Sequence, residues 1–376
     1  MTLPPRFRQC RHLLDVTLPW TIVYCLALSS SFVCSLYALV PSSVRRLPRD
    51  DASHIKWRAA IVVCVATMGA GAYPLLFCRN IAFAEDDVES SSFPPWYAYL
   101  GFSWRPMQDI KIAVHVLMPY LGALTCSWLR IYHLGRILRR DEEDGTDREE
   151  GATRRRLPIA PGPKHLRESL DVAWIRPTCR SLRSLVVDED QRWTNIRNLA
   201  VAPLAEEVVF RACLLPPLLA CGGGTLSPAV ASWIAPLFFG VAHLHHLHEQ
   251  YKRVPPGHMS RAVLRRIFLG VMLQFAYTTL FGAYVSHVFV RTGSLGAATI
   301  AHVVCNYMGL PEVGFAHPTS NLHGYRYVIA SMYLVGIGVF VIGFESRIFP
   351  RASVLPSLLY PSKVDGRSSS QSIFVA

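Results

Sequence analysis

Charged residues are scarce in this chain. Only 17% of its 376 residues are Asp, Glu, Lys or Arg, whereas soluble domains carry about 25%. The shortage is concentrated in six runs that contain none of these four residues, namely 16–44, 59–78, 112–129, 212–248, 267–290 and 327–344. A run of about 18 or more apolar residues is long enough to cross a bilayer as a helix. The composition therefore excludes an ordinary soluble enzyme, a disulfide scaffold and a disordered chain, and it predicts a multispanning membrane protein.

Several local motifs of known enzyme and binding classes are also missing. The ten cysteines include no CxxC pair, and most lie in the apolar runs, so we interpret them as small buried side chains. There is no GxSxG elbow of a serine hydrolase, and His248-Glu249 is not completed to HExxH. The net charge of +12 comes from basic residues that flank the apolar runs, without the aromatic interleaving that would stack bases. We therefore expect no nucleic-acid partner.

The apolar runs predict an all-α fold, a polytopic transmembrane helix bundle with about eight spans. We expect these spans near 16–40, 59–78, 112–130, 199–220, 226–248, 267–290, 293–311 and 327–344. The chain then divides into four parts: N-terminal transmembrane helices in 1–130 (about three spans), a charged cytosolic loop in 131–198, a catalytic transmembrane core in 199–311, and the last span with a polar tail in 312–376.

The loops indicate an orientation in the membrane. Segments 41–58 and 249–266 are rich in Lys and Arg, and with eight spans they share one side with 131–198. The positive-inside rule makes that side cytosolic, and it places the acidic segment 79–111 in the lumen. The same scheme puts the C-terminal tail in the lumen although the tail is basic, so the side of the tail stays open.

Ionisable side chains within an apolar span mark a functional site by default. The sequence EEVVFR at 206–211 carries three of them. Glu207 and Arg211 are i,i+4 neighbours on a helix, so their spacing predicts an ion pair. Glu206 lies about 100° further round the helix and has no such local partner, which makes it a candidate general base. The alternative for the Glu–Arg pair is a buried salt bridge that only fixes helix packing.

Two further clusters supply histidines and an amide. Four histidines occur within HLHHLH at 243–248, beginning with His243, and they indicate acid–base chemistry or metal binding. His302 and Asn306 are one helical turn apart, and both can donate hydrogen bonds to a developing oxyanion. A glutamate base, a histidine partner and two donors on three separate helices suit the water-mediated hydrolysis of an amide.

In their order along the chain, these motifs resemble those of the eukaryotic type II CAAX endopeptidases, within the glutamate-dependent intramembrane peptidases. The resemblance covers residues 192–311 and rests on the EExxxR, FxxxH and HxxxN motifs, which begin at Glu206, Phe239 and His302. Other similar segments are Arg197-Asn198, Ala202-Pro203, 277–282, 291–293 and 305–311.

The resemblance implies an endopeptidase that removes the C-terminal tripeptide from farnesylated or geranylgeranylated CaaX proteins. It implies a multi-pass protein of the endoplasmic reticulum membrane, without metal or cofactor, and with the lipid bilayer as its setting. It assigns roles to six residues: catalytic Glu206 and His243, transition-state-stabilising His302 and Asn306, and supporting Glu207 and Arg211. The prenyl chain of such a substrate fits this membrane setting, because each of its buried CH₂ groups adds about 0.8 kcal/mol of membrane affinity.

Two alternatives stay open. Glutamate and histidine are acceptable zinc ligands, so Glu206 or Glu207 with His243 and His302 could form a metalloprotease for the same substrates. The adjacent carboxylates cannot both face one metal, which weighs against it. The second alternative is a non-enzymatic membrane scaffold or transporter whose buried charges serve packing or ion passage.

Overall fold

The computed structural model is built from helices. It describes residues 11–12, 17–79, 96–102, 106–133, 189–224, 226–243, 250–252, 254–255 and 257–345. Most of the charged loop and the C-terminal tail lie outside these ranges, so their predicted sides of the membrane stay predictions. Within the described residues the extended structure is one antiparallel pair of two-residue strands, β1 (Arg11–His12) and β2 (Cys78–Arg79). The all-α fold class is therefore confirmed.

Five of the described helices are long and apolar enough to cross a membrane. They are α1 (Leu18–Ala38), α3 (Ala52–Phe77), α5 (Pro106–Leu117) extended through η3 (Met118–Tyr120) as far as His133, α14 (Arg261–Thr292) and α16 (Arg326–Glu345). Two shorter apolar helices are α12 (Pro228–His243) and α15 (Leu295–Met308). The minor elements are α2 (Ser42–Arg45), α4 (Trp96–Tyr99), η6 (Gly314–Ala316) and η7 (His323–Tyr325). The total of eight spans stays a prediction.

The outward faces of the long helices are apolar. Helix α16 is the most apolar of the five, yet only 17% of its spanning window is buried inside the protein. Large apolar side chains are exposed on the long helices, including Leu334 and Ile342 on α16 and Trp20 on α1, as expected of helices that face lipid. The described free cysteines are buried except for Cys34 and Cys64; for these two the prediction of burial is wrong, because they lie on exposed faces of α1 and α3.

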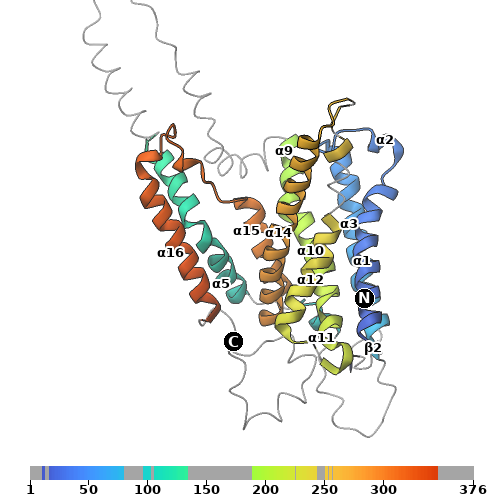
Figure 1. The fold of residues 1–376 in the computed structure, drawn as a ribbon. Coiled ribbons are helices and arrows are strands. Elements are labelled where there is room, and N and C mark those ends of the chain that lie inside the picture. The colour runs from blue at the N-terminus through green and yellow to red at the C-terminus, as the bar shows by residue number, and fades with distance from the viewer. Residues whose placement is uncertain are drawn as a thin grey trace, which may run out of the picture.

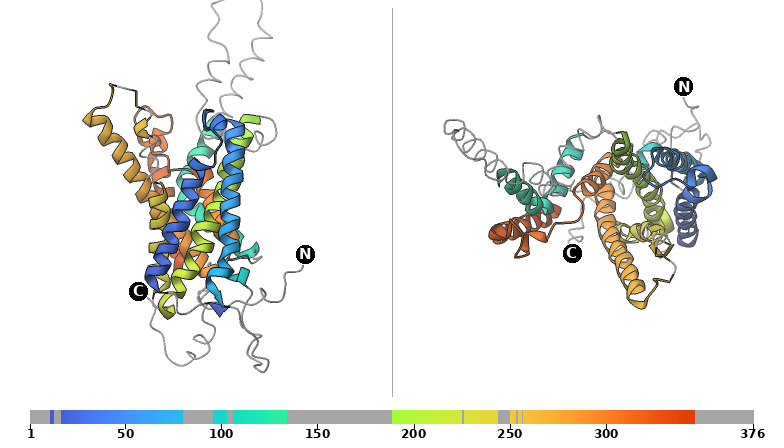
Figure 2. Two further views of the ribbon diagram at one scale, coloured as in Figure 1. Left: turned by 90° about the vertical axis from the view of Figure 1, so that its right-hand side faces the viewer. Right: turned by 90° about the horizontal axis from the view of Figure 1, so that it is seen from above.

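The helices run side by side in one bundle. Figure 1 shows α16 and α5 at one side, α1 and α3 at the other, and α10, α12, α14 and α15 between them. Seen from above in Figure 2, the α5–α16 pair stands apart from the packed group of α1, α3 and α12. Helix α5 contacts α15, and α12 packs along α14. A continuous apolar core joins these central helices and includes Phe32, Phe210 and Phe289.

The expected span at 199–220 is one helical segment in which α-helical and π-helical stretches alternate. It begins before the expected boundary, with α9 (Glu189–Ile196), and continues through the π-helix η4 (Arg197–Val201), α10 (Ala202–Glu207), the π-helix η5 (Val208–Cys213) and α11 (Leu215–Gly224). Pro203 follows η4 and Pro216 follows η5. Because proline has no N–H and its ring crowds the preceding turn, it favours a widened turn beside it. The two glutamates therefore sit between two π segments, which often mark functional sites.

Capping residues fix the turn between α14 and α15. Gly293 ends α14 with a φ of 59°, the left-handed region that glycine enters without strain, and its N–H bonds to the carbonyl oxygen of Phe289. The Ser294 hydroxyl accepts from the N–H of Ala297 at 3.1 Å and donates to Asp109 of α5 at 2.9 Å. This turn sets the start of α15, which carries His302 and Asn306.

Candidate active site

Glu207 is the buried centre of an ionic cluster. Its side chain is 0% exposed, and its Oε1 lies 3.1 Å from Nη1 of Arg211. The same oxygen lies 2.7 Å from Nδ1 of His302. The ion pair predicted from the i,i+4 spacing is therefore present, and His302 is added to it from a distant helix. A carboxylate in this setting holds the rotamers of two other polar side chains.

Arg211 is held on three sides. Besides Glu207, its Nη2 lies 3.5 Å from the carbonyl oxygen of Gly282 on α14, and its guanidinium stands 5.4 Å from the ring centroid of Phe239 on α12. A Cβ at Gly282 would come within 2.8 Å of Pro236 and 3.3 Å of Arg211. The glycine thus permits the close approach of α12 and α14 that encloses the guanidinium.

Glu206 differs from its neighbour because its side chain is 21% exposed. Its carboxylate opens into a cavity of about 570 Å³ that is also lined by His302, Asn306 and Tyr277. Oε2 of Glu206 lies 3.7 Å from Nε2 of His302, which is longer than a hydrogen bond. Glu206 is therefore the carboxylate that a molecule in the cavity can reach.

His302 and Asn306 both face this cavity from α15, as their spacing predicts. His302 packs edge-on against Phe281 with ring centroids 5.6 Å apart. The Asn306 amide nitrogen donates to the backbone carbonyl oxygen of Asn198 at 3.0 Å. An amide NH₂ has two N–H donors. One of them bonds to the backbone of η4, and the second is available to a molecule in the cavity.

His243 is the last residue of α12. Its side chain and residues 244–249 lie outside the described part of the chain. Its partnership with Glu206 therefore stays a prediction. The described residues hold no group of three or more His, Cys, Asp or Glu side chains that could bind a metal ion, and the zinc alternative requires His243.

A second cavity, of about 410 Å³, touches Glu206 from another direction and was not predicted as part of the site. Arg49 and Arg58 line it together with Arg197. In the sequence the first two residues belong to the basic segment 41–58, where the rule for membrane orientation accounts for them. The only feature of the sequence that pointed to these two arginines was their position beside a span. Many arginines that only set the membrane orientation share this position.

We expect Glu207→Gln to lower both the amount of protein in the membrane and its activity. The change leaves Arg211 buried without its counter-ion, and breaking a buried pair costs about 3–5 kcal/mol. Quantitative immunoblotting of membranes measures the amount, and Glu206→Gln is the matched control because Glu206 is partly exposed. The double variant Glu207→Gln/Arg211→Met should recover part of the loss. A Glu207→Gln protein that is inactive but as abundant as the wild type would reverse the roles of the two glutamates.

Fold and site together define a polytopic helical membrane protein with a Glu/Arg/His cluster enclosed in its helix bundle. The family model described as "Type II CAAX prenyl endopeptidase Rce1-like" matches residues 189–308, which span α9 to α15. The human protein named CAAX prenyl protease 2 is 33% identical over 326 residues, which is 86% of this chain and 80% of the human one. The chain belongs to the type II CAAX prenyl endopeptidase family.

Other relatives carry the same name. The rat CAAX prenyl protease 2 is 37% identical over 86% of this chain and 78% of its own length. The one from Arabidopsis thaliana is 37% identical over 47% of this chain and 50% of its own. No solved structure matches the chain. The resemblance inferred from the motifs is therefore confirmed at the level of the family.

Proposed function

We propose that this protein is an endopeptidase of the endoplasmic reticulum membrane that removes the C-terminal tripeptide from prenylated CaaX proteins. The observation that carries the proposal is the carboxylate of Glu206, which opens into a cavity shared with His302 and Asn306. Family membership supports the substrate class. A base, a cavity and two hydrogen-bond donors are the parts that amide hydrolysis requires.

In the proposed reaction Glu206, assisted by His243, accepts a proton from water. The water oxygen adds to the carbonyl carbon of the prenylated cysteine, and the amide C–N bond then breaks. The proton passes to the leaving amine, so the products are a new cysteine carboxylate and a free tripeptide. Glu206 suits this role because Glu207, and not Glu206, is the direct partner of Arg211.

His302 and Asn306 stabilise the tetrahedral oxyanion in this proposal. A carboxylate accepts hydrogen bonds, so Nδ1 of His302 donates to Glu207 across the 2.7 Å contact. Nε2 then donates to the oxyanion when the ring carries both protons. Asn306 contributes its second N–H.

An apolar cavity beside the site is our proposed binding place for the prenyl group. This cavity has a volume of about 540 Å³, and Tyr277, Phe281 and Cys305 line both it and the Glu206 cavity. Its other walls include Trp233 and Phe340. We place the isoprenoid chain there, because apolar burial is its main source of binding free energy.

The test is a cleavage assay on membranes that contain this protein, with one CaaX peptide in prenylated and unprenylated forms. We expect release of the tripeptide from the prenylated form only. A chelator should leave the rate unchanged; loss of activity that zinc restores would favour the metalloprotease. No cleavage of either peptide by folded protein would favour the non-enzymatic scaffold.

A further inference from the structure

The apolar cavity of about 540 Å³ runs along the helix bundle away from the candidate active site. Tyr277 and Cys305 line both this cavity and the one that holds Glu206. Along α14 the lining continues from Tyr277 through Phe281 as far as His287. An α-helix rises by about 15 Å from Tyr277 to His287, at 1.5 Å per residue. The cavity therefore begins at the site and has a depth that α14 measures.

Aromatic rings line the far end of this cavity. They are Tyr284 and His287 of α14 with Phe340 and Phe344 of α16, and we call these four rings the end wall. The ring of Phe344 contacts the other three, with centroids 5.0, 5.8 and 5.4 Å from those of Phe340, Tyr284 and His287. Two neighbouring helices thus close the cavity with packed rings.

His115 of α5 holds the end wall in place. Its ring stacks on that of Phe340, with centroids 4.5 Å apart and an angle of 13° between the planes. Nδ1 of His115 lies 3.0 Å from the hydroxyl oxygen of Tyr284, and Nε2 donates to the carbonyl oxygen of Phe340 at 2.9 Å. The His115 side chain is buried. Because both of its ring nitrogens are bonded, His115 fixes one ring from each of the other two helices.

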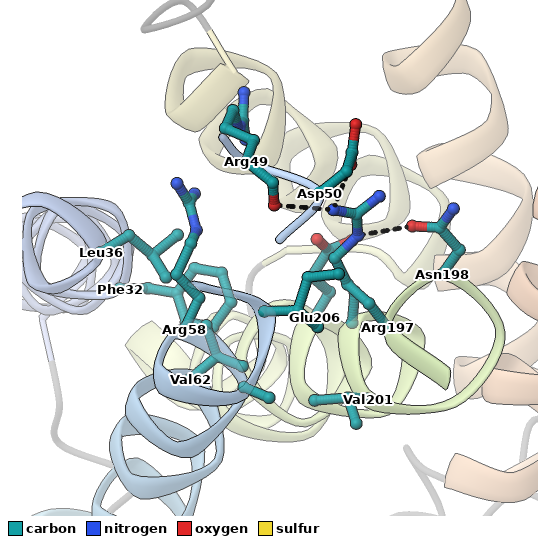
Figure 3. Close-up of a pocket in the computed structure, with 13 residues that line it drawn as sticks. Phe32, Leu36, Arg49, Asp50, Arg58, Val62, Arg197, Asn198, Val201 and Glu206 are labelled. Atoms are coloured by element: carbon teal, nitrogen blue, oxygen red, sulfur yellow. Dashed lines mark hydrogen bonds and ion pairs between the residues drawn. The ribbon is translucent and has the colours of Figure 1, made fainter. Parts of the chain in front are cut away.

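The second cavity beside Glu206 has a different chemistry. Figure 3 shows Arg197 at this cavity with its bonds to Asp50 and Asn198. The side chains of Arg197 and Asp50 are 30% and 76% exposed. An isoprenoid chain laid over them would remove water from charged groups without replacing its hydrogen bonds, which is unfavourable. An isoprenoid therefore fits the apolar cavity better, and there the end wall limits the space for it.

The depth of the apolar cavity matches one length of isoprenoid. A single C–C bond of about 1.5 Å advances an extended chain by about 1.25 Å. The main chain of a farnesyl group has about twelve carbons and reaches about 14 Å, whereas that of a geranylgeranyl group has about sixteen and reaches about 19 Å. The first length fits the depth of about 15 Å, and the second exceeds it by about one isoprene unit.

We propose that the end wall sets the length of isoprenoid that this protein accepts, and that farnesyl is the preferred group. The proposal rests on the proposed function and names its substrate class more narrowly. Lipid tails are as apolar as the cavity, so the choice between two chains in the membrane depends on steric fit. The last isoprene unit of a geranylgeranyl chain meets rings that His115 holds in place, and overpacking a well-packed site is unfavourable.

The test uses one CaaX peptide that carries a geranyl, a farnesyl or a geranylgeranyl group on its cysteine. The proteins are the full-length wild type, Phe344→Ala and His287→Ala in vesicles of neutral lipid. The measurement is kcat/KM, with KM expressed as the mole fraction of membrane-bound peptide so that partitioning does not enter. Ile342→Ala is the matched control, because Ile342 lies on the same helix as Phe344, is exposed and does not line the cavity.

We expect the wild type to cleave the farnesyl peptide at least about fivefold more efficiently than the geranylgeranyl peptide, the low end of the effect of overpacking. Phe344→Ala and His287→Ala should each bring that ratio toward one, because they remove a ring from the end wall. Ile342→Ala should keep the wild-type ratio. The geranyl chain reaches only about 9 Å, so it ends before Phe344 and serves as the internal reference. A loss of folded protein lowers all three rates equally and leaves the ratios intact.

Two results would overturn the proposal and leave the proposed function standing. One is equal efficiency of the wild type on the farnesyl and geranylgeranyl peptides, which would mean that the longer chain leaves the cavity sideways into lipid. The other is a farnesyl preference that stays unchanged in both Phe344→Ala and His287→Ala. Failure of the folded wild type to cleave any of the three peptides would instead reject the proposed function.

Discussion

Replacement of Glu206 by Gln should lower the rate of tripeptide release by at least about 100-fold, the effect of losing a general base. The amide side chain keeps the size of the carboxylate and one of its acceptor oxygens, but it cannot take a proton from water. The amount of protein in the membrane should change little, because the Glu206 side chain is 21% exposed and its Oε2 lies 3.7 Å from Nε2 of His302, beyond hydrogen-bond distance. Initial rates on a prenylated peptide, normalised to protein amount, measure the effect.

Glu206→Asp is the companion variant. It keeps the carboxylate but withdraws it by one methylene, so its activity should lie between those of the wild type and Glu206→Gln. Near wild-type cleavage by Glu206→Gln would remove Glu206 from the role of base. If Glu206→Asp were no more active than Glu206→Gln, position and not basicity would be the dominant requirement.

The positions of the long helices could be predicted from the sequence, because their apolar runs are uninterrupted. Their ends could not. Helix α3 begins at Ala52 and α14 at Arg261, each at least six residues before the apolar run. A helix continues into polar residues as long as its backbone is hydrogen-bonded and nothing breaks it, and hydropathy does not register this. The π segments on either side of the glutamates could not be predicted either, because every argument from residue spacing assumes a helix with 3.6 residues per turn.

Within the site, sequence spacing predicted contacts inside one helix but not between helices. Glu207 and Arg211 pair as their spacing indicates, and His302 and Asn306 face the same cavity. That Nδ1 of His302 binds Glu207 and not Glu206 depends on how α15 is rotated against α10. This rotation is fixed by the Gly293–Ser294 turn and its bond to Asp109, which lies far away in the sequence.

The same reasoning explains why two arginines were assigned only to membrane orientation. Arg49 and Arg58 flank an apolar run, and a basic flank is the ordinary signal of a cytosolic loop. Their approach to Glu206 depends on the packing of α3 against η5 and α10, a contact that no local pattern encodes. A basic residue that sets the membrane orientation and a basic residue that lines a cavity cannot be distinguished in the sequence.

Asn306→Ala should reduce kcat by roughly 10²–10³, which corresponds to about 2.7–4 kcal/mol for one preorganised donor to an oxyanion. KM should change little, because the donor acts on the tetrahedral state more than on the bound peptide. Asn306 is exposed to the cavity, and its one bond to the Asn198 carbonyl is at the surface. We therefore expect the amount of protein to stay near that of the wild type.

Asn306→Asp tests whether hydrogen-bond donation or the shape of the side chain is what matters at this position. Aspartate has nearly the size of asparagine but replaces the N–H donor by a negative charge that opposes the oxyanion, so this variant should be less active than Asn306→Ala. Purified variants assayed on one prenylated peptide, with kcat and KM determined separately, decide between the roles. A higher KM with kcat intact would make Asn306 a residue that binds substrate. The oxyanion would then depend on His302, which lines the same cavity and whose orientation Glu207 already fixes.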